Sequence, residues 1–73
     1  MSLQEILMML ARYQLDSIGT SERQGQALSR CLSLYSPRLL SKLESADIDP
    51  FNNDELIPAF YTAVAALWDD RDN

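Results

Sequence analysis

The sequence predicts an all-α fold: a small bundle of about four helices, two long and two short, in one domain spanning residues 1–73. Apolar residues recur at helical spacing along most of the chain, which indicates amphipathic helices. No segment alternates with period two, and no hairpin dipeptide lies between strand-like runs. A chain of 73 residues has room for one domain only, so the predicted helices must share a single core.

The first helix is predicted to begin after Ser2 and to run to about Ile18. Ser2 and Glu5 match a capping box, in which each side chain accepts a hydrogen bond from the backbone N–H of the other residue. Gly19 follows as the left-handed residue that ends a helix. Apolar side chains cover more than half of the circumference and form two adjacent faces. One face holds Leu3, Ile6, Leu7, Leu10 and Tyr13, and the other holds Met8, Ala11, Leu15 and Ile18.

A shorter helix is predicted next. Thr20-Ser21 followed by Gln24 is typical of a helix start. Gly25 weakens the first turn by about 1 kcal/mol relative to alanine, so a start as late as Gln26 also fits the pattern. From there the apolar residues continue at helical spacing as far as Tyr35.

A second short helix follows Ser36-Pro37. Proline disfavours the helical state of the residue before it and fits the first helical position behind a serine cap. Leu39, Leu40, Leu43 and Ala46 then continue at helical spacing. The turn at residues 47–50 closes this helix.

The stretch from Asn53 to Asp70 is predicted to be the element around which the chain is organised. Asn52 or Asn53 caps it, and Pro58 in its first turn leaves an irregularity or delays the helix start. Between Leu56 and Trp68, Thr62 is the only polar side chain, so the helix is apolar nearly all the way round.

The two long helices present more apolar surface than two short helices can cover. At about 25 cal/mol per Å², a few uncovered side chains forgo several kcal/mol, comparable to the whole stability of a small domain. We therefore predict a homodimer that packs through the long helices, or a monomer that offers the same face to a different protein. The predicted interface residues are Leu56, Phe60, Tyr61, Val64, Leu67 and Trp68.

The charge is distributed unevenly along the chain. The net charge is −5, yet residues 21–43 carry +3 and residues 44–73 carry −7. The acidic part, which includes Asp69, Asp70 and Asp72, favours a partner protein with a basic surface. The predicted function is that of a small regulatory or adaptor protein that acts by binding another protein, including as an inhibitor.

The alternative is a DNA-binding transcriptional regulator. Residues 28–44 resemble the helix-turn-helix of repressor-type DNA-binding domains, and the likeness is best from Ser36 to Glu44. In that arrangement Leu39 would point at the DNA, and the sequence pI of about 4.3 opposes attraction to phosphate. The residues that the resemblance places on DNA are Arg30, Arg38, Ser41 and Lys42.

No constellation of residues indicates catalysis, a cofactor or a metal site. The chain has no histidine to act as a base near neutral pH, and it has no glycine-rich phosphate loop. Cys31 lies between Leu28 and Leu32 in a helical pattern, so we expect an inert, buried thiol. No stretch approaches the ~20 apolar residues of a membrane span. We expect a cytoplasmic protein that is not an enzyme and does not enter the membrane.

Overall fold

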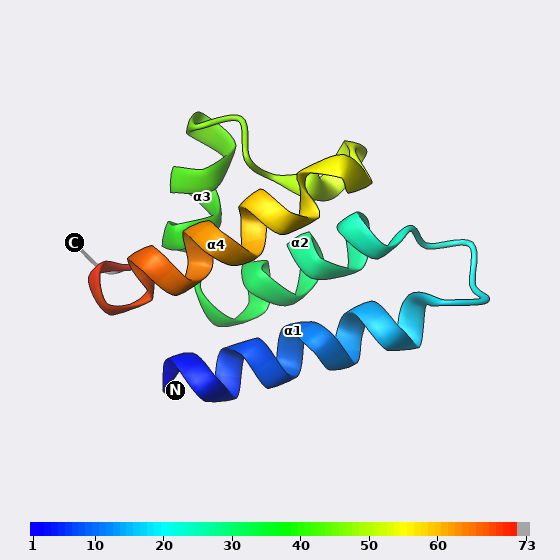
Figure 1. The fold of residues 1–73 in the computed structure, drawn as a ribbon, viewed down its shortest axis with the longest axis horizontal. Coiled ribbons are helices and arrows are strands. Elements are labelled where there is room, and N and C mark those ends of the chain that lie inside the picture. Colours follow the sequence, from blue (N-terminus) through cyan, green and yellow to red (C-terminus); the bar gives the residue numbers. More distant parts are fainter. Residues whose placement is uncertain (72–73) are drawn as a thin grey trace.

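A computed structural model describes residues 1–71, and every regular element within them is helical (Figure 1). The predicted all-α bundle of four helices is confirmed for this part of the chain. Asp72 of the predicted acidic segment lies outside the described residues. The α-helices are α1 (Leu3–Ser17), α2 (Gln24–Tyr35), α3 (Pro37–Ser45) and α4 (Ile57–Leu67). Three short 3-10 turns join or extend them: Pro50–Asn52, Asp54–Leu56 and Trp68–Asp70.

The ends of α1 follow the predicted local signals. The Ser2 N–H donates to Glu5 Oε1 at 2.9 Å, and the Glu5 N–H donates to Ser2 Oγ at 3.1 Å, which completes the capping box. Gly19 has φ of +85°, the left-handed conformation expected of a residue that ends a helix. From this capped start α1 runs alongside α2, its main packing partner (Figure 1).

The start of α2 depends on residues far along the chain. Its cap position, Arg23, makes no side-chain capping bond, and the helix begins at Gln24, between the two predicted starts. The Gly25 N–H donates to Asp54 Oδ1 at 3.0 Å. A Cβ at Gly25 would lie 2.2 Å from the Pro50 carbonyl oxygen, so only glycine allows α2 to approach this turn so closely.

The turn between α2 and α3 forms as the sequence predicts. Pro37 occupies the first turn of α3, and the Leu39 N–H donates to Ser36 Oγ. Ser36 is buried, so its hydroxyl satisfies a backbone donor that water does not reach.

The last helix is shorter than predicted. Asn53 Oδ1 accepts from the Glu55 N–H at 3.0 Å, but this cap opens a 3-10 turn, and α4 begins only at Ile57. Pro58 accounts for the delay, because its ring clashes with the carbonyl of the residue four positions earlier in a continuous α-helix. With 11 residues, α4 is slightly shorter than the 12-residue α2, so the predicted division into two long and two short helices does not hold.

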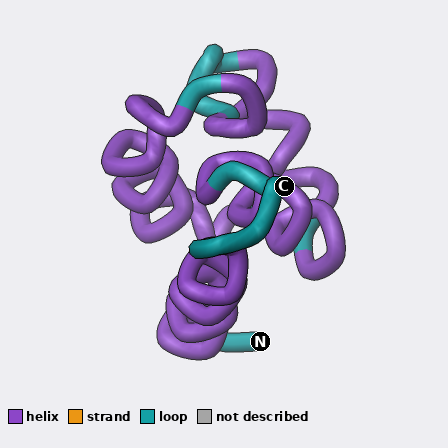
Figure 2. Tube along the Cα trace, turned by 90° about the vertical axis from the view of Figure 1, so that its right-hand side faces the viewer, coloured by secondary structure: helices purple, strands orange, loops and turns teal. Residues whose placement is uncertain are grey.

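All four helices contribute to one core. Figure 2 shows the packed helices in the view along the long axis, and the buried cluster draws residues from each of them. Cys31 is fully buried there, as predicted, and burial raises the pKa of its thiol to about 11. The other large buried side chains are Ile6, Leu10, Leu28, Leu32, Leu39, Leu43, Pro50, Phe60, Val64 and Trp68.

Candidate protein interaction surface

The fold divides the predicted interface residues into two groups. Phe60, Val64 and Trp68 belong to the core of a single copy, and Trp68 is only 1% exposed. The side chains of the same chain cover these three residues, so a partner protein has no direct access to them. The accessible members of the predicted set are the half-buried Leu56 and Tyr61 and the exposed Leu67.

A polar contact joins α4 to α1 beside the core. Tyr61 Oη donates to Gln14 Oε1 at 2.7 Å, and Gln14 Nε2 donates to Gln24 Oε1 at 2.8 Å. Burial raises the pKa of the Tyr61 phenol, which therefore remains a hydrogen-bond donor. Sequence reasoning missed the two glutamines. The available signal was the position of Gln14 one turn after Leu10, at the edge of the buried face of α1.

Part of the apolar surface that remains accessible lies along α1 and at the residue that follows it, and Leu34, Tyr35, Phe51 and Leu67 are exposed elsewhere. Met8, Leu15 and Ile18 are 65%, 67% and 61% exposed, although each belongs to one of the two apolar faces predicted for this helix. We call the row that contains them the α1 stripe. It consists of Gln4, Met8, Ala11, Leu15 and Ile18.

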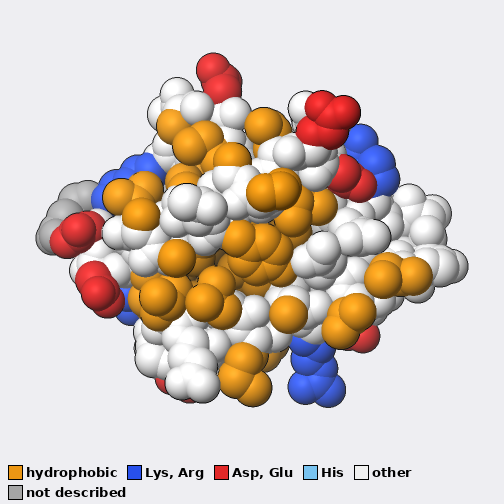
Figure 3. Space-filling model, in the orientation of Figure 1, with side chains coloured by type: hydrophobic (Ala, Val, Ile, Leu, Met, Phe, Trp, Pro, Cys, Tyr) orange, Lys and Arg blue, Asp and Glu red, His pale blue; other side chains and the backbone are white. Residues whose placement is uncertain are grey.

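Three residues of the α1 stripe also line an apolar hollow. Leu3, Gln4, Leu7, Met8 and Ala11 line a shallow hollow of about 570 Å³. On the face shown in Figure 3, hydrophobic side chains gather in the middle, over α1 and α4, and charged side chains lie toward the edges. An apolar centre with a polar rim is the usual anatomy of a protein–protein interface.

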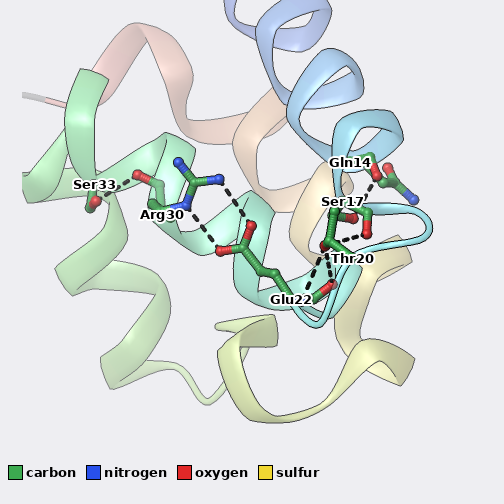
Figure 4. Close-up of polar contacts among 6 residues, drawn as sticks. All are labelled: Gln14, Ser17, Thr20, Glu22, Arg30 and Ser33. Atoms are coloured by element: carbon green, nitrogen blue, oxygen red, sulfur yellow. Dashed lines mark hydrogen bonds and ion pairs between the residues drawn. The ribbon is translucent and has the colours of Figure 1, made fainter.

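A second, more polar groove lies between α2, α3 and the turn at Pro50–Asn52. Its volume is about 510 Å³, and its charged lining residues are Glu22, Glu44, Asp49 and Arg30. Arg30 holds Glu22 through two hydrogen bonds of 3.0 and 2.9 Å (Figure 4), which lower the pKa of the Glu22 carboxyl. With three carboxylates and one guanidinium, the groove is net negative and offers a complementary environment to a cationic side chain.

The residues of the helix-turn-helix alternative make contacts within the chain. Arg30 pairs with Glu22, and its guanidinium also lies 4.9 Å from the centre of the Tyr13 ring. Lys42 Nζ donates to the Asp70 carbonyl at 2.9 Å. Ser41 and Arg38 lie on the exposed side of α3. Leu39 is fully buried, so the objection that its side chain would point at DNA does not apply to the helix-turn-helix alternative.

Within residues 1–71, no group of three or more His, Cys, Asp or Glu side chains is arranged to hold a metal ion. No helix in that part of the chain combines the length and hydropathy needed to cross a membrane. Comparison with protein-family models, with curated proteins and with solved structures finds no match to this chain.

Proposed function

We propose that this chain is a small regulatory or adaptor protein that acts by binding another protein, including as an inhibitor, and that it does so as a homodimer. The observation that carries the proposal is the exposure of Met8, Leu15 and Ile18 along one side of α1. Single exposed apolar residues are ordinary on a monomer, whereas a contiguous row is typical of an interface.

The energetics favour covering this row. Full burial of one such side chain contributes ~1.5–3 kcal/mol, and a symmetric pair buries the row of each copy. The total gain is of the same order as the ~4–15 kcal/mol that association costs in translational, rotational and side-chain freedom. We therefore expect a dimer whose population depends on protein concentration in the micromolar range.

The acidic surface supports a partner protein with a basic face. The groove beside α2 is net negative, and Asp69 and Asp70 are exposed beyond α4. Complementary charge accelerates association and discriminates against partners of the wrong sign. The apolar α1 stripe and the acidic groove are lined by different residues, so one can serve self-association while the other serves the partner.

Sedimentation velocity over a range of micromolar concentrations tests the homodimer. We expect the mass to rise from 8.3 kDa toward twice that value as the concentration increases. Leu15→Glu should hold the chain at the monomer mass, because it places a charge in the apolar row. Leu34→Glu is the matched control, since Leu34 is 63% exposed on α2, away from the stripe. A constant 8.3 kDa species at every concentration would remove the homodimer from the proposal.

Affinity capture from the native cell tests the regulatory role. A specific partner should be retained by the wild-type chain and by Leu34→Glu, and lost from the charge-reversed double variant Glu44→Lys/Asp49→Lys. Retention should weaken as salt is added, because electrostatic attraction is screened. Capture that is equal for the wild-type chain and the double variant would contradict the assignment of the acidic groove to the partner.

A further inference from the structure

The α1 stripe has the spacing of a seam between two helices. Its five residues follow one another at intervals of four, three, four and three positions, which is the alternation of a heptad seam. The opposite side of α1 faces the core through Ile6, Leu10 and Ser17, all buried. One side of α1 therefore packs in the core of a single copy, and the apolar stripe on the opposite side remains exposed.

The composition of the stripe fits a second copy of itself. Ala11 stands at its middle, and the longer Met8 and Leu15 flank it. When two such helices run antiparallel with their alanines together, Met8 of each copy faces Leu15 of the other, and Gln4 faces Ile18. The small central residue lets the backbones approach closely, and the flanking side chains fill the space on either side.

The charge distribution favours the same arrangement. Residues 1–20 carry a net charge of only −1, whereas residues 44–73 carry −7. None of the five stripe residues is charged. Two copies that meet through α1 therefore avoid most of the like-charge repulsion that they would meet through their C-terminal parts.

We propose that the occupant of the α1 stripe is a second copy of this chain, whose α1 packs antiparallel on the first with the two-fold axis at Ala11. This inference rests on the homodimer of the proposed function and specifies the relative orientation of the two α1 helices and the position of the two-fold axis. The seam is then formed by residues that a single copy leaves exposed, instead of by Phe60, Val64 and Trp68.

Disulfide cross-linking in the full chain tests the seam. The native Cys31 is fully buried, so it contributes little background. Under mild oxidation, Ala11→Cys should form a covalent dimer at least 10-fold faster than Leu34→Cys, whose site is exposed on α2. A mixture of Met8→Cys and Leu15→Cys should cross-link faster than either variant alone, because the antiparallel arrangement places each beside the other.

The outcomes separate the two proposals. If sedimentation shows a dimer but Ala11→Cys links no faster than Leu34→Cys, the α1 seam is wrong and the homodimer stands. If Met8→Cys and Leu15→Cys each link only to themselves, the helices run parallel and the inference is overturned. A chain that remains monomeric in sedimentation removes both the homodimer and the seam.

Discussion

The indole Nε1 of Trp68 donates a hydrogen bond to the backbone carbonyl of Met1 at 3.0 Å, which joins the end of the helical region to the start of the chain. The Arg71 guanidinium covers the same ring at 4.0 Å from its centre and donates to the Trp68 carbonyl at 2.7 Å. Trp68 therefore packs between Met1 and Arg71, and this position explains why the largest apolar side chain is absent from the surface.

Replacement of Trp68 should destabilise the monomer. Trp68→Phe loses the hydrogen bond to Met1 together with some ring volume, and we expect a loss of about 1–2 kcal/mol. Trp68→Ala should cost about 3–5 kcal/mol, because it also leaves a cavity. Urea unfolding followed by circular dichroism measures both changes without a tryptophan signal. Leu67→Ala is the control, since Leu67 is 37% exposed and should have a much smaller effect. Equal stability of Trp68→Phe and wild type would contradict this role.

Gly25→Ala should destabilise the fold, although alanine is the better helix former. Propensity alone predicts a gain of about 1 kcal/mol in α2. The new methyl group would instead collide with the Pro50 carbonyl and with Asp54 Oδ1, and overpacking of this kind typically costs about 1–3 kcal/mol. The midpoint of urea unfolding shows whether the substitution stabilises or destabilises the fold. A higher midpoint in Gly25→Ala would show that the turn at Pro50 moves aside freely.

Stability should fall below pH 4.5 partly through Glu5 and Glu22. Hydrogen bonds from Ser2 lower the pKa of Glu5, and those from Arg30 lower the pKa of Glu22, each from the usual 4.5. When folding lowers the pKa of a carboxyl, that carboxyl stabilises the native state at pH values above its pKa in the unfolded chain. The stabilisation disappears as the pH falls through the pKa that the carboxyl has in the folded chain.

The double variant Glu5→Gln/Glu22→Gln tests this pH dependence. Its unfolding midpoint in urea should vary less between pH 5 and pH 3 than that of the wild type. Arg30→Gln should remove the share of this pH dependence that comes from Glu22, because Arg30 is the partner that lowers the pKa of the Glu22 carboxyl. If the unfolding midpoint of both variants changes between pH 5 and pH 3 as much as that of the wild type, other carboxyls govern acid unfolding.

The Cys31 thiol should be unreactive in the folded chain. It is fully buried, and its pKa of about 11 leaves almost no thiolate at pH 8. We expect modification by a disulfide reagent to be at least 100-fold slower in buffer than in denaturing urea. Leu34→Cys provides an exposed thiol in the same molecule as an internal reference. Rapid modification of both thiols in buffer would show that the core opens frequently.

DNA should not bind to this chain at physiological salt. Arg30 and Lys42 are engaged with Glu22 and with the Asp70 carbonyl, and the net charge of −5 repels phosphate. We expect a labelled DNA duplex to migrate unchanged in a retardation gel at micromolar protein concentration. Retardation that weakens with salt and is lost in Arg38→Ala and Lys42→Ala would restore the helix-turn-helix alternative.

Local chemistry explains which features could be predicted from the sequence. The Ser2–Glu5 box, Gly19 and the Ser36-Pro37 turn each act within a few residues, and all three were predicted and are confirmed. The division of Asn53–Asp70 into 3-10 and α-helical parts was only partly anticipated from Pro58.

Packing in three dimensions determines which apolar faces are covered. The periodicity of the sequence identifies apolar sides on α1 and on the last helix. Because the hydrophobic effect has no direction, this pattern indicates how much apolar surface must be buried. It does not indicate which other part of the molecule covers that surface. The packing places Phe60 and Trp68 inside and leaves Met8 and Leu15 outside. Gly25 likewise acquires its role only through Pro50 and Asp54, which are distant along the chain. The presence of the four helices and the ends set by local caps and turns could be predicted from the sequence, because those features depend on neighbours along the chain. The accessible surface depends on neighbours in space, and only the folded chain brings them together.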